Sequence, residues 1–408
     1  MKNYNFIDLF AGCGGLSEGF YRMGYNALAH VEINSVACKT LKTRMKYYGY
    51  TNYEKEVLEM DITRDDIIDK IDEAVKGRTV DLIIGGPPCQ AYSSLGRAKD
   101  ENAMQNDPRN YLFESYVKVL NHYSPKFFVF ENVTGILSAK VKGRRIIETI
   151  FEALGEKYKV KYDPKMMVLN SANYGVPQIR KRVIIIGVRK DIDIEPEEIY
   201  RDIIKTHYDP EMNEQEAQGL EKYVTVREAI GELPSIYPGE GQPIVEFVSK
   251  RDNEFLKRIR SSNDKVLRDH VARNHNQKDI ERYIAMSKNK WTFKELLENR
   301  VDLRHEKKRV FGNSYTVQWW DLPSKTIIAH LYKDGNQFIH PDYRQGRTFS
   351  VREAARIQSF PDDFVFEGPR TEQFKQIGNA VPPLLAEAIA KCLKEKLDYL
   401  EGVDNNDI

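Results

Sequence analysis

The chain has 408 residues, 41% of them hydrophobic, and its formal net charge is +1. This length suits two or three domains with a substantial core. The four cysteines show no paired C-x-x-C spacing, which argues against a zinc site or a disulfide framework and for a reducing compartment. No apolar run approaches membrane-spanning length, and the first residues lead into a predicted strand without a signal peptide. We therefore expect a soluble, intracellular protein.

The first 190 residues alternate short apolar runs with amphipathic stretches. Helical patterns fit between most of the apolar runs, for example at 111–123 and 145–154. Strands that alternate with helices in this way predict an α/β fold with a parallel, doubly wound sheet. The predicted strands are residues 6–10, 27–31, 81–84, 127–130, 166–169 and 183–186.

The first predicted strand runs into a glycine-rich turn, AGCGG at residues 11–15. Glycine lets the backbone approach a ligand closely, so a strand, small residues and a helix in this order predict a cofactor-binding turn. Glu32, at the end of the next strand and roughly 20 residues on, suits the hydroxyl pair of a ribose. The turn lacks the GxGxxG spacing for a pyrophosphate. A nucleoside cofactor without phosphates fits better, and S-adenosylmethionine is the common one.

A second turn, GGPPCQAYSS at residues 85–94, follows the apolar run 81–84. Two glycines and two prolines make the turn tight and stiff, and Cys89 stands just past the carboxyl end of the strand. Ligand crevices lie at that edge of open parallel sheets, so Cys89 is placed as a nucleophile should be. A lone cysteine is more often a small buried apolar residue. Glu131, just beyond the strand 127–130, can share the crevice, although a strand-end acid alone is ordinary.

Beyond residue 190 the periodic pattern weakens, and the Pro- and Gly-rich residues 231–243 predict a long loop. Residues 191–245 carry 14 acidic and 4 basic residues, whereas residues 246–309 carry 11 acidic and 18 basic. The basic excess suits a polyanion, although such a run alone is more often a solvated helical face. A clear amphipathic helix, opened by two prolines, is predicted at 381–400.

Two segments of the chain beyond residue 190 stand out, DHVARNHN at 269–276 and WWDLPSKT at 319–326. Arg and Asn read base edges by hydrogen bonding, and Arg to guanine is the commonest specific contact. The two tryptophans are at least as well explained as core. His270 and His275 lack a cysteine or carboxylate set at metal spacing, so we expect no metal site.

Taken together, these motifs resemble the DNA (cytosine-5) methyltransferases of bacterial restriction–modification systems. The matches follow the family's order and bracket nearly the whole chain, leaving residues 191 to about 345 without a shared signature. One match could arise by accident, but all of them in order could not, which favours a catalytic Cys89 over a buried apolar one. The matching segments are DLFAGCGG (8–15), Glu32, DI (61–62), PPCQ (87–90), DPRNYLF (107–113), ENV (131–133), QIRKR (178–182), REAARIQSFPD (352–362) and QIGNAVPP (376–383).

The resemblance implies covalent catalysis on a cytosine that has left the helix. Carbon-5 of cytosine is a poor nucleophile, so the Cys89 thiolate would first add to carbon-6. Glu131 would hold the ring nitrogen and the exocyclic amine and protonate the ring. Arg182, together with Arg180, would bind the base carbonyl and the adjacent phosphate.

The resemblance also implies S-adenosylmethionine as cofactor, with Glu32 on the ribose, Asp61 on the adenine amine and Ile62 against the ring. Ile33 departs from the family pattern, in which an aromatic residue often stacks on adenine, so we expect weaker packing there. The other expected cofactor residues line or close the channel, or let the backbone meet the amino-acid end: Phe10, Gly12, Gly14, Pro88, Leu112 and Asn379.

The family organisation implies a discontinuous catalytic domain, residues 1–190 plus 375–408, a target-recognition domain at 191–345 and a hinge segment at 346–374. We expect a monomer in the bacterial cytoplasm that acts on double-stranded DNA, paired with a cognate restriction endonuclease. The residues expected to contact DNA are Gln90, Ser93, Arg273 and Asn274.

Two alternatives compete with this interpretation. The RNA-directed branch of the family, which methylates transfer RNA, has a short recognition region, whereas here residues 191–346 separate the arginine motif from Arg352. A catalytically silent regulator on the same scaffold would lose the cysteine, the glutamate or the cofactor turn, and none of these is lost.

Overall fold

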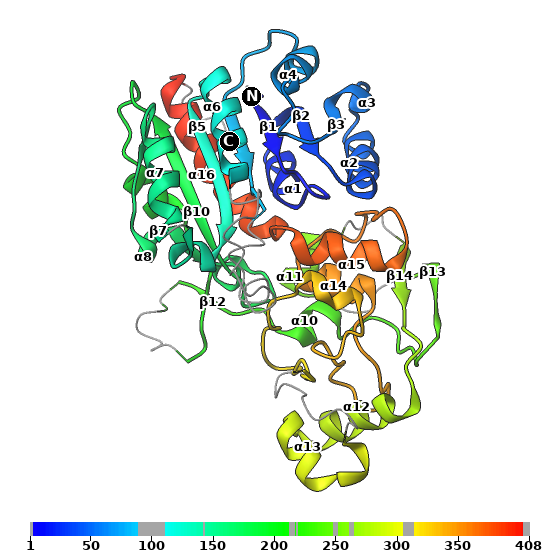
Figure 1. The fold of residues 1–408 in the computed structure, drawn as a ribbon. Coiled ribbons are helices and arrows are strands. Elements are labelled where there is room, and N and C mark those ends of the chain that lie inside the picture. The colour runs from blue at the N-terminus through cyan, green and yellow to red at the C-terminus, as the bar shows by residue number, and fades with distance from the viewer. Residues whose placement is uncertain are drawn as a thin grey trace. The chain divides into compact units, whose positions relative to one another are not determined.

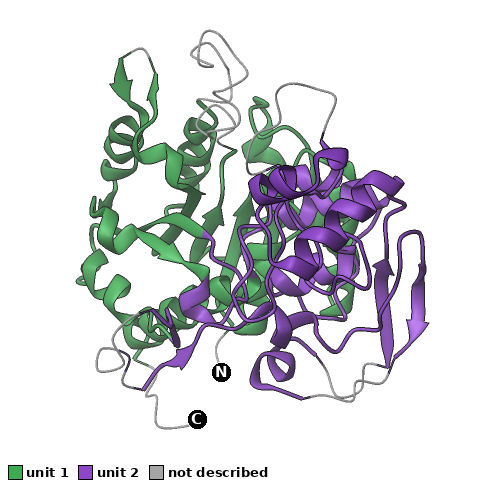
Figure 2. Cartoon of the chain, turned by 90° about the horizontal axis from the view of Figure 1, so that it is seen from below, with its two compact units in different colours: residues 1–171, 181–205, 383–408 green, residues 172–180, 206–382 purple. Residues whose placement is uncertain are grey.

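The computed structural model describes residues 3–88, 111–141, 143–211, 217, 219–247, 252–260, 265–304 and 314–402. The chain divides into two compact units, which Figure 2 colours separately. The first unit comprises residues 1–171, 181–205 and 383–408, and the second comprises residues 172–180 and 206–382. Both ends of the chain therefore build the first unit.

An eight-stranded sheet forms the centre of the first unit, in the order β3-β2-β1-β4-β5-β10-β8, with β9 paired to β10 (Figure 1). Neighbouring strands from β3 to β5 are parallel, which confirms the predicted doubly wound arrangement. The strands are β1 (Asn5–Leu9), β2 (Asn26–Glu32), β3 (Val57–Glu59), β4 (Leu82–Gly85), β5 (Phe127–Val133), β8 (Tyr158–Val160), β9 (Val168–Asn170) and β10 (Lys181–Arg189). A separate hairpin joins β6 (Lys140–Val141) to β7 (Arg144–Arg145).

Strand β10 departs from the expected parallel sheet, because it is antiparallel to β5, β8 and β9. The reason lies in the preceding connection. Helix α7 carries the chain from β5 to β8, which runs in the same direction two positions away, and β10 then fills the space between them from the opposite end.

Helices cover both faces of this sheet. The connections from β1 to β2 and from β4 to β5 run in opposite directions across it, so right-handed crossovers place α1 and α6 on opposite faces. The helices of the first unit are α1 (Gly15–Arg22), α2 (Ser35–Tyr47), α3 (Tyr53–Glu56), α4 (Ile67–Val75), α6 (Leu112–Tyr123), α7 (Ile146–Gly155), α8 (Pro164–Met167), α9 (Pro196–Asp202) and α16 (Pro383–Leu400), with the short 3-10 turn η3 (Thr134–Leu137). A second such turn, η4 (Ser171–Tyr174), begins in the first unit and continues into the second.

The C-terminal helix α16 packs directly on α1, although almost the whole chain separates them. A Cβ on Gly19 would lie 2.3 Å from the backbone nitrogen of Glu387, so only glycine permits this approach. The Tyr25 hydroxyl donates to the carbonyl of Ala390 at 3.0 Å, and the Tyr4 hydroxyl donates to Asp398 at 2.7 Å. Helix α16 is therefore an integral layer of the first unit.

The second unit combines short helices with two small sheets. One of its cores is a cluster around α12 and α13 that includes Tyr283, Phe293 and Tyr315, and Trp319 packs against it, which agrees with the reading of that tryptophan as core. The elements are β11 (His207–Tyr208), β12 (Glu221–Lys222), α10 (Val226–Ile230), β13 (Gly241–Glu246), α11 (Glu254–Ile259), β14 (Val266–Val271), α12 (Gln277–Asn289), α13 (Phe293–Asn299), η5 (Val301–Leu303), η6 (Ala329–Tyr332), α14 (Val351–Ile357) and α15 (Arg370–Asn379).

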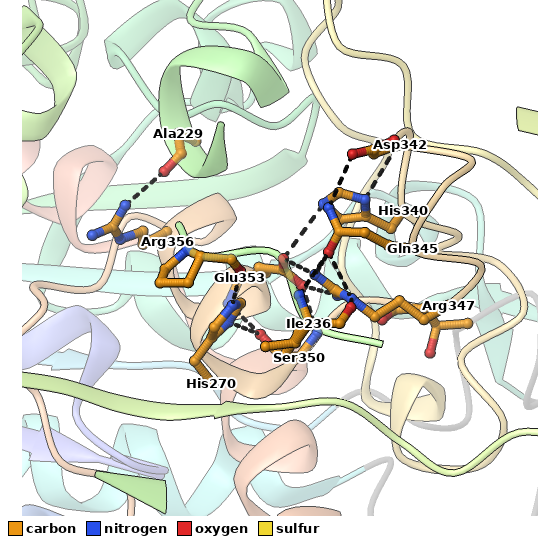
Figure 3. A network of polar contacts seen from close by, with 12 residues as sticks. Ala229, Ile236, His270, His340, Asp342, Gln345, Arg347, Ser350, Glu353 and Arg356 are labelled. Atoms are coloured by element: carbon orange, nitrogen blue, oxygen red, sulfur yellow. Dashed lines mark hydrogen bonds and ion pairs between the residues drawn. The ribbon is translucent and has the colours of Figure 1, made fainter. Parts of the chain in front are cut away.

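Helix α14, which carries the REAARIQSFPD motif, is the polar centre of the second unit (Figure 3). Arg347 and Glu353 form a fully buried ion pair at 2.7 Å, and the Glu353 carboxylate also accepts the backbone N–H of Ser350. His270, from β14, contacts the Ser350 hydroxyl at 3.0 Å, and Arg356 donates to the carbonyl of Ala229. The buried charges are thus paired and hydrogen-bonded, as burial requires, and they tie three segments to one helix.

Two local predictions were wrong. Residues 166–169 were expected as a strand, but Asp163 caps α8 by accepting the backbone N–H of Lys165, and Pro164 begins the helix, so β9 starts only at Val168. The loop expected at 231–243 ends at Gly241, where β13 pairs with β14.

Candidate active site

The carboxyl ends of five neighbouring strands meet at one edge of the sheet, and the strand order reverses between β1 and β4. Ligands of open α/β sheets bind outside this switch point. Most of the predicted site residues follow strand ends at this edge: Phe10, Gly12 and Gly14 after β1, Glu32 and Ile33 at β2, Asp61 and Ile62 after β3, Pro88 after β4 and Glu131 near the end of β5.

The turn after β1 has a strained backbone. Phe10 has a φ of 61°, which is unfavourable for a bulky side chain, and Gly12 and Gly14 have φ values of 56° and 87°. A Cβ on Gly14 would lie 2.8 Å from a side-chain carbon of Leu41, whereas a Cβ on Gly12 would have no described atom within 4 Å. The turn therefore packs tightly on one side and faces open space on the other.

Glu32 is held rigidly beside this turn. One carboxylate oxygen accepts the backbone N–H of Gly12 at 2.8 Å, and the other accepts the N–H of Asn34 at 2.7 Å. Each oxygen has a second lone pair for a ligand hydroxyl. Ile33, the next residue, is 67% exposed.

Asp61 and Ile62 follow β3, whose end is joined to β2 by a hydrogen bond from Met60 N–H to the Glu32 carbonyl. Asp61 is exposed, and one of its oxygens accepts both the backbone N–H and the hydroxyl of Thr63. Ile62 is buried. A fixed carboxylate beside an apolar residue suits an aromatic ring that carries a hydrogen-bond donor.

The turn after β4 is the tightest part of the site. A Cβ on Gly85 would lie 2.3 Å from the carbonyl oxygen of Leu9, and a Cβ on Gly86 would lie 2.6 Å from a carboxylate oxygen of Glu131. The amide of Asn132 donates to the carbonyl of Pro87 at 3.1 Å. Gly85 is therefore required by the close approach of the Leu9 backbone, whereas a side chain at position 86 would displace the Glu131 carboxylate. Asn132, the residue after Glu131, anchors the turn that leads to Cys89.

Glu131 and Arg182 form the polar pair of the site. They are diagonal neighbours on the paired strands β5 and β10, since Glu131 pairs with Ile184 and Arg182 with Val133. The guanidinium Nε lies 2.9 Å from a carboxylate oxygen, and the Glu131 and Arg182 side chains are 14% and 12% exposed. Burial lowers the pKa of Arg182, while the adjacent Glu131 opposes that shift, so the arginine stays charged. The pair thus presents a carboxylate whose orientation is fixed by a neighbouring cation.

The remaining predicted catalytic and cofactor residues do not stand at these strand ends. Arg180 is buried in the second unit, where its guanidinium donates to the carbonyls of Ile327, Gly378 and Ala380. Asn379 is exposed at the end of α15, also in the second unit. Leu112 is half-buried at the start of α6 in the first unit.

The residues expected to contact DNA are only partly described. Arg273 is 4% exposed, donates to the carbonyls of Leu331 and Lys333 and stacks over the Phe374 ring, whereas its neighbour Asn274 is exposed. Base contact by Arg273 stays a prediction that would require these bonds to be exchanged. Cys89, Gln90 and Ser93 lie outside the described residues.

Sequence reasoning missed a buried network beneath the cofactor turn. The Ser17 hydroxyl donates to Asp8 at 2.5 Å, and the His30 ring lies 3.2 Å from the same hydroxyl and 2.9 Å from the Tyr21 hydroxyl. Burial raises the pKa of Asp8 to about 8 and lowers the pKa of His30 to about 3, so both groups favour their neutral forms. The signal available in the sequence was an acidic residue at the end of an otherwise apolar strand.

Comparison with known proteins agrees with this geometry. Residues 4–395 match the family described as C-5 cytosine-specific DNA methylase. The Type II methyltransferase M.DdeI of Desulfomicrobium norvegicum is 35% identical over 99% of this chain and 92% of its own. M.Bpa9945I of Bacillus paralicheniformis, also a Type II methyltransferase, is 34% identical over 96% of this chain and 99% of its own. A crystal structure of a prophage-encoded E. coli protein, provisionally described as a DNA modification methyltransferase, covers 97% of this chain and 100% of its own, with 26% identity and a TM-score of 0.70.

The fold and the strand-end residues define a doubly wound α/β enzyme of the methyltransferase type. The chain belongs to the C-5 cytosine-specific DNA methylase family and is a DNA (cytosine-5) methyltransferase. Over the described residues, no three His, Cys, Asp or Glu side chains gather as a metal site would require. Among the helices that the structure describes, none has the length and apolarity needed to span a membrane.

Proposed function

We propose that this enzyme methylates carbon-5 of a cytosine flipped out of a specific double-stranded DNA site, with S-adenosylmethionine as methyl donor and a covalent Cys89 adduct as intermediate. The main support for this proposal is the Glu131–Arg182 pair beside the Gly86–Pro87 turn, because that turn leads along the chain to Cys89. A nucleophile, an acid and an oriented cation are what addition to a pyrimidine requires.

The residues after β1, β2 and β3 fit a nucleoside cofactor. Gly12 faces open space, the Glu32 carboxylate has free lone pairs for ribose hydroxyls, and exposed Ile33 offers an apolar surface for a base. Asp61 can accept from an exocyclic amine. S-adenosylmethionine, when bound, supplies an electrophilic methyl group.

The residues of the chain would then carry the remaining chemistry. The Cys89 thiolate forms a bond to carbon-6 while Glu131 delivers a proton to the ring nitrogen, so the ring becomes a neutral enamine instead of a bare anion. After carbon-5 has been methylated, water takes up its proton, the carbon–sulfur bond breaks and the ring nitrogen returns its proton to Glu131. These steps restore the neutral aromatic ring, the free thiolate and the protonated carboxyl group. Arg182 fixes the orientation of the Glu131 carboxylate and can bind the base carbonyl.

The relatives are Type II methyltransferases, which supports a role in restriction–modification. We propose that the enzyme acts as a monomer in the bacterial cytoplasm and protects host DNA from a cognate endonuclease. The second unit would carry target recognition, since its sequence between the arginine motif and α14 has no shared signature. A transfer RNA substrate is the competing possibility that the experiment below includes.

The test uses the full-length enzyme with S-adenosylmethionine and a DNA duplex in which target cytosines are replaced by 5-fluorocytosine, whose fluorine blocks the final elimination. Wild type should form a denaturant-resistant adduct, and Cys89→Ser should form none while still binding duplex. Sequencing of methylated cytosines in DNA from cells expressing the chain identifies the site. Methylation of transfer RNA but not of duplex, or no adduct with wild type, would overturn the proposal.

A further inference from the structure

Backbone carbonyls at the C-terminal end of helix α15 need hydrogen-bond donors, and one buried arginine provides them. Arg180 is 1% exposed, and its Nη2 donates to the carbonyls of Gly378 at 3.0 Å and Ala380 at 2.9 Å. Its Nη1 donates to the carbonyl of Ile327 at 2.6 Å. A guanidinium placed at a helix C-terminus also opposes the negative end of the helix dipole.

The two carbonyls bound by Nη2 flank a single residue, Asn379. Its side chain is exposed, while the backbone on either side is held by Arg180. The preceding Gly378 is fixed as well, because a Cβ there would lie 2.3 Å from the backbone nitrogen of Ala329. The segment around Asn379 therefore has little freedom, and the direction of the Asn379 side chain depends on these contacts.

Two glutamine side chains, Gln178 and Gln358, add hydrogen bonds to the same backbone segments. Gln358 donates to the carbonyl of Ala380 at 2.6 Å, and Gln178 donates to the Gln358 side chain at 2.5 Å. The Gln178 side chain also accepts the backbone N–H of Ile327, whose carbonyl is bound by Arg180. The first and third residues of the QIRKR motif thus point into the second unit and are used on the ends of α14 and α15.

We propose that Arg180 is a positioning residue for the cofactor, acting through Asn379, and that it does not touch the flipped base. The inference rests on the proposed function and on the family resemblance, which implies that Asn379 borders the cofactor channel. The two arginines of the QIRKR motif would then have different roles. Arg182 pairs with Glu131, which acts on the base, and Arg180 fixes the backbone on either side of Asn379. A guanidinium whose donors serve three buried carbonyls is poorly placed to be recruited by a substrate.

The test is a double-mutant cycle on the full-length enzyme, read by calorimetric binding of S-adenosylmethionine and by kcat and KM for duplex. Arg180→Ala and Asn379→Ala should each weaken cofactor binding about tenfold, the scale of a lost charge-assisted bond. The double variant should be no weaker than the worse single one, because both changes remove the same interaction. The KM for duplex should stay near the wild-type value.

A matched pair of lysine variants separates positioning from general damage. Arg352 is also fully buried and also donates to three backbone carbonyls, those of Arg268, Pro361 and Phe364, none of which flanks Asn379. Arg180→Lys should weaken cofactor binding, whereas Arg352→Lys should lower the melting temperature and leave cofactor affinity unchanged. This pair also decides the matter if Arg180→Ala does not fold.

Several outcomes would overturn the inference. Additive losses in the cycle would mean that Arg180 and Asn379 act independently. Unchanged cofactor affinity combined with a raised KM for duplex or a slower chemical step would show that Arg180 acts on the base instead of on the cofactor. Equal losses of cofactor affinity in Arg180→Lys and Arg352→Lys would reduce its role to stability. Failure of wild type to bind the cofactor would instead contradict the proposed function itself.

Discussion

Asp8 shows how a single buried carboxyl can be accommodated under a binding turn. It lies at the end of β1, fully buried, with one hydrogen bond from Ser17, and burial raises its pKa to about 8. The unfolded chain ionises this group near pH 4, whereas the folded chain keeps it protonated up to about pH 8. Between these values the unfolded state gives up the proton that the folded state retains, so this group's contribution to stability falls as pH rises.

Asp8→Asn should remove this pH dependence while keeping an acceptor for Ser17. The loss in wild type between pH 5 and pH 8 is at most about 1.4 kcal/mol per pH unit. Buried His30 titrates in the opposite sense, so the quantity to measure is the difference in free energy of unfolding between variant and wild type across pH. We expect the variant to gain stability relative to wild type as pH rises. A difference independent of pH would show that Asp8 is ionised in the folded protein.

Glu32 supports a second prediction at this scale. Glu32→Gln keeps the size and one acceptor oxygen but removes the charge that holds both the Gly12 and Asn34 N–H groups. We expect cofactor affinity to fall about tenfold to a hundredfold, since hydrogen bonds to charged groups contribute about 1.5–3 kcal/mol, with duplex affinity little changed. Calorimetry on both ligands tests this. Equal cofactor binding in variant and wild type would remove Glu32 from the site.

At the scale of elements, the sequence was most informative where the local pattern decides the structure. The strands at β1, β2, β4, β5 and β10 and the helices α6, α7 and α16 were predictable because each is long and apolar on at least one face. The strands β3 and β8 were missed because three residues carry no usable periodicity. The residue types of the site were recognisable as motifs, but contacts such as Asn132 to Pro87 depend on how separate elements approach each other.

The turn after β4 offers a test of such an approach. Gly86 has ordinary backbone geometry, so Gly86→Ala adds only a methyl group, 2.6 Å from the Glu131 carboxylate. The carboxylate must move, and we expect kcat to fall by about 100-fold, the scale of a misplaced acid–base group, with cofactor affinity retained. Gly155→Ala, at the end of α7, meets no described atom closer than 3.9 Å and serves as the control. Equal activity in both variants would show that the Glu131 position is not critical.

At the scale of the whole molecule, the first unit depends on residues from both ends of the chain. Helix α16 contributes a row of fully buried apolar residues, among them Leu384, Leu385 and Ile389, and its neighbour α1 begins at the cofactor turn. Removing α16 would expose the surface of α1 around Gly19, on which this helix packs. Each buried leucine or isoleucine that is lost costs about 1.5–3 kcal/mol of hydrophobic stabilisation, so the total is comparable to the stability of a typical domain.

We therefore expect a chain that ends at Val381 to lose the fold of the first unit and, with it, cofactor binding. A chain that ends at Gly402 keeps all of α16 and the bond from Tyr4 to Asp398, and it should melt like wild type.

Gly19→Val is a milder version of the same test, because its side chain would collide with the backbone of Ala386 and Glu387 without removing any of α16. It should lower the melting temperature by several degrees or more, since overpacking typically costs about 1–3 kcal/mol. Circular dichroism, thermal melting and cofactor calorimetry on these three chains measure the effect. A chain lacking α16 that still melts cooperatively and binds the cofactor at wild-type strength would show that residues 1–205 fold on their own, and that the C-terminal helix only covers a surface that is already stable.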